Sequence, residues 1–392
     1  MTMRRITSCP LVRACQFHSF FQLSLISVNP RRHSSIEALQ ASLEEKLTTQ
    51  PKNRIIDYLS PTPTCLLNIA LADFLPKSYA ESSAWLKDYH VSKPLPQAHH
   101  LVYFPTQARS SGILPDGTDN IQSPGSPYDR RMWAGGSLRF SAKDVDQVQL
   151  LEDGRFTRYC CTEFMTNVRI KGTEGDEKVF VTIKREIARV DAMSFAIDRT
   201  AVRDSRGHMT EQSFSSSLGE PALVEERNLV YLRPKSSDAI ISDLGPSKKL
   251  LIPTMEPDHS FELTPDRALL FRFSALTFNA HAIHLDQQYC REVEGHRDLL
   301  VHGPLSLVLM FSILRSQLKE REIVLNFDYR NLAPLYVGER MRVCIKKDTT
   351  KKSRYDVWIE GKDGGYAVKG SATVGNIEEA KANGLDKSDS TS

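Results

Sequence analysis

The order of the predicted elements limits the fold of this chain more than any other feature. Stretches with the alternating apolar and polar character of strands follow one another with only turn residues between them. In the first half these stretches are 133–140, 155–170, 178–188 and 229–232, and in the second half 323–329, 339–346, 355–361 and 366–374. Strands that run consecutively build antiparallel sheets, so the pattern argues against a βαβ fold.

Each half also contains helical sequence, so the two halves share one plan. Apolar residues from Ile36 to Leu47 recur at three- and four-residue spacing, which predicts helix in the region 37–90. Residues 305–318 predict an apolar helix in the second half. We therefore predict an α+β fold in which each half wraps a curved antiparallel sheet around one central helix. Two such units side by side would complete one shared sheet.

Composition predicts the remaining segments and the domain boundaries. The run HLVYF at 100–104 predicts a short buried strand, and the Gly- and Pro-rich stretch 110–128 predicts a long loop. A chain of 392 residues suits two domains plus tails. The predicted divisions are an N-terminal domain at 50–235, a linker at 236–257, a C-terminal domain at 258–376 and a disordered tail at 377–392. The polar stretch 191–226 predicts a loop excursion.

The N-terminus has the composition of a targeting segment. Residues 1–36 contain five arginines and several serines, and the first carboxylate of the chain is Glu37. An Arg-rich, Ser-rich and acid-free start predicts a mitochondrial transit peptide over residues 1–35, cleaved near 32–35. The alternative is a basic tail. The predicted location is therefore the mitochondrial matrix.

Overall charge and cysteine spacing narrow the class of protein. The chain has 51 basic and 48 acidic residues, and a net charge of +3 argues against a dedicated nucleic-acid binder. The seven cysteines are scattered without zinc spacing, which predicts a reducing compartment and no structural metal. No apolar stretch approaches the roughly 18 residues of a membrane span. No GxGxxG or P-loop pattern indicates a nucleotide site.

The residues that could carry chemistry gather in the second half. Asn279, His281, His284 and Asp286 lie within eight residues, and His302-Gly303-Pro304 opens the apolar helix. An imidazole exchanges a proton near neutral pH, and an amide can orient a water molecule or a carbonyl. This combination suits the addition of water to a double bond conjugated with a thioester, or its removal. The alternatives are a structural role for the cluster and metal binding by His281 and His284.

Other residues are candidates for substrate contact. The N–H of Gly303, at a helix start, could bind the negative charge that develops on a thioester oxygen, or Gly303 could be an ordinary turn glycine. Arg130 and Arg131 could meet the phosphates of a CoA or phosphopantetheine carrier, or form a solvated turn. The full set of predicted substrate-binding residues is His281, Asp286, His302, Arg131 and Trp133. Trp133, like Tyr103, also suits a place in the core.

The segment from Phe278 to Asp286 resembles the signature of the MaoC-like or (R)-specific enoyl-thioester hydratase superfamily, Asp-x-Asn-Pro-[Ile/Leu]-His-x-Asp. Ile283, His284 and Asp286 match it. Asn279 stands at the Asp position, His281 at the Asn position and Ala282 at the Pro position. The stretches 100–104 and 131–136 (RMWAGG) look like the N-terminal half of the double hot-dog branch, which includes mitochondrial hydroxyacyl-thioester dehydratases type 2 and mesaconyl-C4-CoA hydratases.

The resemblance implies a double hot-dog fold whose second half keeps the catalytic residues, without a metal or redox cofactor. It implies that His284 is the general acid and base and that the N–H of Gly303 is the oxyanion donor. An amide cannot accept a proton, so Asn279 would orient the catalytic water while His284 transfers the proton alone.

The predicted function is a hydro-lyase that interconverts 3-hydroxyacyl and trans-2-enoyl thioesters in mitochondrial type II fatty acid synthesis. The predicted partners are an acyl-CoA or acyl carrier protein thioester and a second copy of the chain in a homodimer. An alternative substrate is mesaconyl- or itaconyl-CoA, which arginine near the acyl end of the tunnel would favour. A thioesterase would need Asp286 or Glu292 to face the site. A non-catalytic thioester-binding protein is a further alternative.

Overall fold

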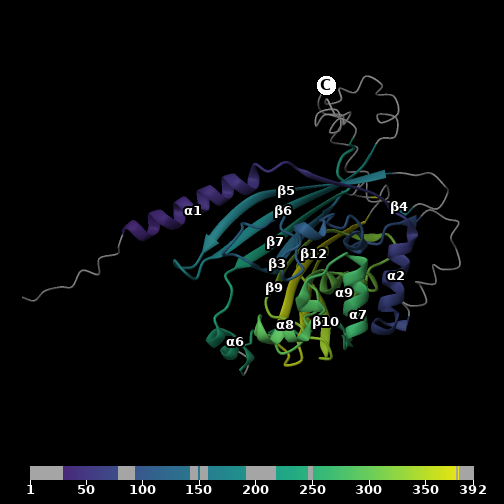
Figure 1. Ribbon diagram of the computed structural model, residues 1–392. Coiled ribbons are helices and arrows are strands. Elements are labelled where there is room, and N and C mark those ends of the chain that lie inside the picture. The colour runs from purple at the N-terminus through teal and green to yellow at the C-terminus, as the bar shows by residue number, and fades with distance from the viewer. Residues whose placement is uncertain are drawn as a thin grey trace, which may run out of the picture.

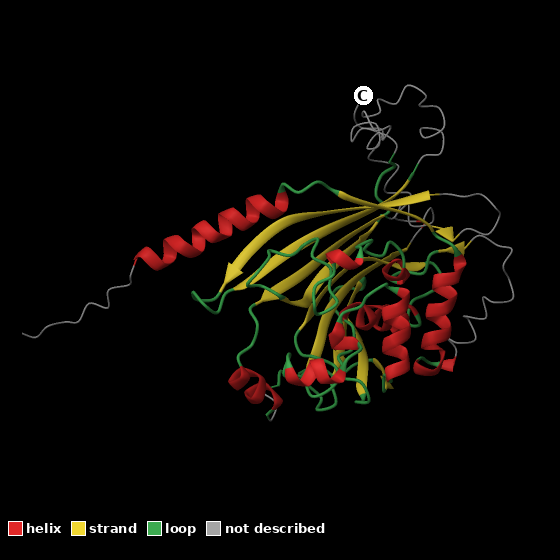
Figure 2. Ribbon diagram, in the orientation of Figure 1, coloured by secondary structure: helices red, strands yellow, loops and turns green. Residues whose placement is uncertain are grey.

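The computed structural model describes residues 30–77, 93–141, 149–150, 158–190, 218–245, 250–376 and 378. Their main feature is one antiparallel sheet of ten strands, seen as the long yellow arrows of Figure 2. In spatial order these are β1 (Asn53–Tyr58), β5 (Arg158–Lys171), β6 (Lys178–Arg189), β7 (Leu223–Leu232), β3 (Arg130–Phe140), β9 (Glu322–Asn331), β12 (Tyr366–Asn376), β11 (Arg354–Glu360), β10 (Met341–Lys347) and β8 (His259–Leu263). A separate small pair joins β2 (Lys93–Pro94) to β4 (Gln149–Leu150).

The two halves of the chain meet at β3 and β9. Strand β3 pairs with β7 on one side and with β9 on the other, so one sheet crosses the junction. Two glycines make this double pairing feasible. A Cβ on Gly135, whose φ is +146°, would lie 2.4 Å from the backbone oxygen of Tyr329, and a Cβ on Gly136 would lie 2.1 Å from that of Glu226. Larger residues would push the neighbouring strands away.

The helix α9 (Gly303–Arg315) lies at the centre of the C-terminal half. All of its residues from Leu305 to Leu314 are buried, and it packs against β10 and β11. A helix that is apolar on every side can be stable only when it is enclosed. Figure 1 shows α2 (Pro61–Leu71) and α7 (Arg267–Leu276) on the same side of the strands as α9, and α2 packs against α7.

The N-terminal half is covered differently. The helix α1 (Pro30–Thr48) packs against β5 and places Leu43 and Leu47 in a small apolar cluster with residues of β5, β6 and β7. Next to this cluster lies a buried row of charges, Glu163, Arg185 and Glu225, at neighbouring positions on those three strands. The prediction of one central helix per half therefore matches the C-terminal half. In the N-terminal half, none of the described helices is enclosed as α9 is.

The shorter helices complete the described structure. They are α6 (Ser237–Leu244), α8 (Gln287–Glu292), and the 3-10 turns η1 (Ala72–Phe74), η2 (His99–Val102), η3 (Ser110–Gly112) and η4 (Ala282–His284). No helix in the described parts of the chain is both long enough and apolar enough to cross a membrane.

Several local predictions were wrong. The run 100–104 forms the buried turn η2 and its continuation rather than a strand, because an unbroken apolar run carries no periodicity. The strand β1 interrupts the helix predicted over 37–90. Strand β7 begins at Leu223, within the predicted loop excursion.

Other predictions fall wholly or partly on residues that the structure does not describe. Of the transit peptide predicted over 1–35, residues 1–29 are outside the described part, and α1 begins at Pro30. Of the tail predicted over 377–392, only Glu378 is described. The strand predictions of the C-terminal half agree with β9 to β12 within three residues at each end.

Candidate active site

The loop that carries the polar cluster is anchored by a capped helix at each end. Asp266 accepts a hydrogen bond from the N–H of Leu269 at 2.7 Å and caps α7, and Asp286 accepts one from the N–H of Tyr289 at 3.0 Å and caps α8. Inside the loop, the N–H of Asn279 donates to the oxygen of Ser274 at 2.9 Å. The side-chain oxygen of Asn279 accepts from the N–H of His281 at 3.1 Å. These bonds fix the loop between two rigid helices.

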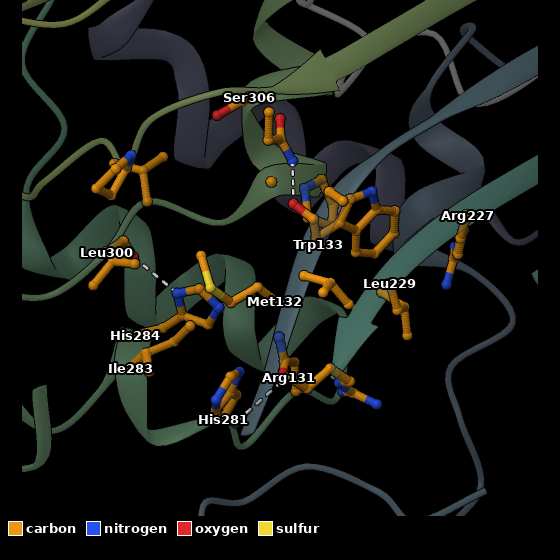
Figure 3. A pocket seen from close by; sticks show the side chains of 18 of the residues that line it. Arg131, Met132, Trp133, Arg227, Leu229, His281, Ile283, His284, Leu300 and Ser306 are labelled. Atoms are coloured by element: carbon orange, nitrogen blue, oxygen red, sulfur yellow. Dashed lines mark hydrogen bonds between the residues drawn. The ribbon is translucent and has the colours of Figure 1, made fainter. Parts of the chain in front are cut away.

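His284 has a defined orientation and a free nitrogen. Its Nδ1 lies 2.8 Å from the carbonyl oxygen of Leu300, as the dashed line in Figure 3 shows. A carbonyl oxygen only accepts, so Nδ1 carries the hydrogen and Nε2 keeps its lone pair. The ring stacks on His302 with centroids 3.6 Å apart. His284 is therefore a positioned base whose proton-accepting atom is Nε2.

Burial keeps this base neutral. Removal from water lowers the pKa of His284 to about 4, and the positive charge of Arg131 acts in the same direction, while the hydrogen bond to Leu300 opposes the shift. The pKa of His281 also lies well below the ordinary value, because of burial and then the neighbouring His284 and Arg131. Both imidazoles are accordingly uncharged at neutral pH.

His302 is a buried neighbour of His284. It is fully buried, its Nε2 lies 2.8 Å from the hydroxyl of Ser274, and its ring also meets Phe273. It does not line either of the two cavities that Asn279 borders. The structure therefore does not support the predicted contact of His302 with substrate, and its stacked ring suits holding His284 in place.

A cavity of about 300 Å³ opens beside His284 and is lined from both halves of the chain. The loop between α7 and α8 contributes Asn279, His281 and His284, and strand β3 contributes Arg131 and Trp133. Figure 3 shows His281 and His284 of the loop beside Arg131 and Trp133 of β3. A second cavity of about 490 Å³ shares part of this wall. Its shared residues are Thr106, Asp119, Arg131, Trp133, Arg227, Asn279 and Pro304.

Gly303 lies at the start of α9 and on the first cavity. His302 is the N-cap residue, and its side chain makes no hydrogen bond to the helix. The first backbone N–H groups of α9 are therefore not bonded by that side chain. A Cβ on Gly303 would lie 3.3 Å from Trp133 Cγ and 3.0 Å from Asn331 Nδ2. Glycine thus lets β3 approach the helix start, where the backbone and the helix dipole favour negative charge.

Comparison with known proteins identifies the family. The family model for hydroxyacyl-thioester dehydratase type 2 matches residues 98–337, which is more than half of the chain. The chain belongs to this family. The mitochondrial hydroxyacyl-thioester dehydratase type 2 of Schizosaccharomyces pombe is 26% identical over 296 residues, covering 74% of this chain and 89% of the relative. The mesaconyl-C(4)-CoA hydratase of Chloroflexus aurantiacus is 28% identical over 284 residues, covering 72% and 84%.

Solved structures agree on the fold. A MaoC-like dehydratase from Phytophthora capsici aligns with a TM-score of 0.53 at 12% identity, covering 85% of this chain and 98% of that one. The predicted double hot-dog fold is thereby confirmed. Membership of the type 2 dehydratase family identifies the chain as a hydratase or dehydratase, which confirms the predicted class of enzyme.

Within this type 2 dehydratase fold, the two arginines of the RMWAGG region have internal partners. The guanidinium of Arg130 binds Glu294, with Nη2 2.6 Å from Oε2, and Nη1 of Arg131 lies 3.1 Å from Asp119 Oδ2. Arg130 is buried and lines neither cavity, so the structure does not support a contact between Arg130 and a carrier phosphate. Arg131 and Trp133 do line both cavities, and Trp133 donates from Nε1 to the hydroxyl of Tyr329 at 2.9 Å.

Asp286 lies away from the cavities. It is exposed, it caps α8, and neither cavity includes it, so the structure does not support its predicted contact with substrate. Glu292 accepts from Gln288 at 3.0 Å on the surface of α8. A thioesterase would need one of these carboxylates in the cavity. Among the described residues, no cluster of three His, Cys, Asp or Glu side chains could hold a metal ion.

The sequence interpretation missed the buried charges of the cavity wall. Arg185 binds Glu163 at 3.1 Å and Glu225 at 3.2 Å, and Arg227 Nε lies 2.9 Å from Glu225. Glu163 and Arg227 line the first cavity. One signal was available: Arg185 falls on the apolar phase of the alternation Val179, Val181, Ile183, Ile187, where a charge is unusual.

Proposed function

We propose that this chain catalyses the reversible hydration of trans-2-enoyl thioesters to 3-hydroxyacyl thioesters, with His284 as the proton-transferring group. In the hydration direction, Nε2 of His284 takes one proton from a water molecule while the water oxygen bonds to the β-carbon. The electron pair of the double bond moves toward the thioester, whose oxygen accepts a hydrogen bond from the N–H of Gly303. Nε2 then returns its proton to the α-carbon, and the reverse sequence dehydrates the 3-hydroxyacyl thioester.

One observation carries this proposal. A neutral imidazole with its lone pair on Nε2 and a glycine at a helix start line the same cavity. Asn279 lies on that cavity as well, and its side-chain oxygen is engaged with the N–H of His281. Its amide NH₂ group is therefore the part that holds the water oxygen. Asn279 orients the water but does not take a proton.

The proposed substrate is a fatty acyl thioester on acyl carrier protein, in the mitochondrial matrix. The name of the Schizosaccharomyces pombe relative, a mitochondrial hydroxyacyl-thioester dehydratase, supports the thioester and the location, and the acid-free N-terminus supports the location. The proposed divisions of the chain are the two hot-dog domains at 50–235 and 258–376, joined by 236–257. We also propose a homodimer as the assembly. Cell fractionation with a tagged full-length chain tests the location, and a cytosolic pool alone would contradict it.

A short dicarboxylic CoA ester such as mesaconyl- or itaconyl-CoA is the second candidate substrate. Arg131 and Arg227 line the cavity beside His284, and cationic groups there favour a second carboxylate. Each arginine already has a carboxylate partner, Asp119 and Glu225 respectively, which lowers this preference. Hydration rates for crotonyl-, long-chain enoyl- and mesaconyl-CoA, followed by absorbance of the conjugated thioester, decide between the two candidates.

The first test replaces the proposed base. His284→Ala is expected to lower kcat for hydration by roughly 10²- to 10⁴-fold, because the reaction loses its general acid and base, while thioester binding is retained. Unchanged turnover would refute the assignment of His284. Release of free thiol from an acyl-CoA by the wild type would indicate a thioesterase. Binding without turnover of any thioester would indicate a non-catalytic binding protein.

A further inference from the structure

A carboxylate from the N-terminal half reaches the loop between α7 and α8 in the C-terminal half. Asp116 lies in the loop between η3 and β3, and its backbone oxygen accepts a hydrogen bond from the N–H of Ala282 at 2.8 Å. Its Oδ2 lies 3.5 Å from Nε2 of His281, and the side chains of both residues are more than nine-tenths buried. Asp116 is therefore in the interior beside a residue that lines the reaction cavity.

Only one of the two carboxylate oxygens of Asp116 has its hydrogen bonds. Oδ1 accepts from the N–H of Thr118 at 2.9 Å and from its hydroxyl at 2.7 Å. Oδ2 is buried without a hydrogen-bond partner among the described residues. A buried carboxylate oxygen without a donor is costly, so this atom requires an explanation. His281 Nε2 is the group that faces it.

The contact between the two loops is fixed by a glycine. Gly117 has φ +83°, and a Cβ at this position would lie 1.9 Å from the backbone oxygen of Ala280. Any other residue would force the loop of Asp116 away from the loop of His281. The close approach of the two loops therefore keeps the Asp116 carboxylate next to the His281 imidazole.

We infer that Asp116 is a positioning residue of the reaction site: it holds His281 with hydrogen on Nε2, so that Nδ1 of His281 accepts a hydrogen bond from the reacting water. The inference rests on the proposed function of this site. The hydrogen bond that one ring nitrogen makes determines which nitrogen carries the proton, and a carboxylate is a common partner. Hydrogen bonds at catalytic sites are often long before substrate binds and shorten in the complex.

His281 would accept the second hydrogen bond that the reacting water can donate. A water whose oxygen is held by Asn279 has two hydrogens to donate. One goes to Nε2 of His284, which takes it, and the other points to Nδ1 of His281 and remains in the hydroxyl group of the product. No proton is transferred to His281. Asp116 thus contributes a carboxylate to the site from the other half of the chain.

The test replaces the charge and keeps the size. Asp116→Asn retains an oxygen for Thr118 but presents an NH₂ donor to His281, which is expected to move the hydrogen of that ring from Nε2 to Nδ1. We expect kcat to fall roughly 10- to 100-fold with KM within about twofold, as is typical when the partner of a functional histidine is removed. Nitrogen-15 NMR of the histidine rings measures the tautomer directly and does not depend on activity.

A matched control exists in the same chain. Asp348 makes the same turn as Asp116: its Oδ1 accepts from the N–H of Thr350 at 2.8 Å and from its hydroxyl at 2.6 Å. It lies in the hairpin between β10 and β11, away from both cavities. Asp348→Asn is expected to leave kcat, KM and the ring tautomers unchanged.

A second variant separates positioning from a merely structural role. If Asp116 acts through His281, then Asp116→Asn should have little further effect on kcat in a His281→Asn background. An equal fall in both backgrounds would mean that Asp116 only shapes its loop, and the inference would be wrong. An unchanged tautomer in Asp116→Asn would also refute it. If the wild type hydrates no thioester, the proposed function fails, while the tautomer measurement still decides the Asp116–His281 contact.

Discussion

The two halves of this molecule share one sheet but use its inner face in opposite ways. In the C-terminal half the strands enclose α9, whose residues from Leu305 to Leu314 are buried. In the N-terminal half the corresponding face carries the buried charges of Glu163, Arg185 and Glu225 beside the apolar cluster under α1. The C-terminal half therefore provides an apolar support for the loop of His281 and His284, and the N-terminal half provides a polar wall for the cavity.

The enclosed helix and the row of charges contribute different properties to the same fold. An enclosed apolar helix contributes packing and a well-defined N-terminus at Gly303. A buried row of charges contributes less to stability than apolar side chains of the same size would, but it fixes polar groups at the cavity. Gln122 illustrates this, because it donates to Glu163 at 2.7 Å and lines the same cavity.

The largest expected effect comes from breaking the charged row. Arg185→Met leaves Glu163 and Glu225 as buried carboxylates without their shared partner, which is expected to lower the free energy of unfolding by about 3–5 kcal/mol. Denaturant unfolding followed by circular dichroism measures the change. Arg340→Met is the control, because Arg340 and Glu262 form an exposed pair in the C-terminal half and its loss should cost less than about 1 kcal/mol. Equal effects of the two changes would contradict the distinction between the halves.

A second pair of variants compares the apolar parts of the two halves. Leu309→Ala in α9 removes a fully enclosed side chain and is expected to cost about 3–5 kcal/mol. Leu43→Ala in α1 removes a side chain at the margin of the sheet, which keeps 7% of its surface exposed, and should cost about 2 kcal/mol. The measurement is again equilibrium unfolding. A larger loss for Leu43 than for Leu309 would mean that α1, and not α9, is the main support of the fold.

Near neutral pH the smallest effect is the one that pH has on stability through His284. The lowered pKa of His284, about 4, means that the unfolded chain binds a proton below pH 6.5 that the folded chain does not. Above pH 6.5 His284 is neutral in both states and costs no stability. As the pH falls from 6.5 toward 4, the free energy of unfolding decreases. The expected slope is about 1.4 kcal/mol per pH unit for each proton taken up on unfolding. His284→Gln should reduce the slope by about one proton, and an unchanged slope would contradict the assignment.

The sequence predicted the C-terminal half well because its signals are local. Alternating apolar residues and glycine turns defined β9 to β12, and the polar cluster from Asn279 to Asp286 marked the loop that lines the cavity. The positions of His302 and Asp286 could not be obtained in this way. His302 lies behind the stacked ring of His284, and Asp286 turns to its own helix. Both outcomes depend on tertiary contacts and on capping.

The N-terminal half was harder to predict because its important residues act across long sequence distances. Asp116 lies in a stretch rich in turn residues, and only the folded chain brings it to His281. Arg185 was hidden in a strand pattern that is otherwise apolar. The run HLVYF, which has no periodicity, formed a turn.

The pairing of β3 with β9 has a consequence for how this protein can change over time. Where two identical subunits form such a junction, each substitution occurs twice, and dilution can separate the partners. Here the junction lies within one chain, so its two sides remain together at any protein concentration. One side can therefore gain buried charges, such as the row on β5, β6 and β7, while the other keeps α9 enclosed. A covalent link between the halves made it feasible for each to specialise.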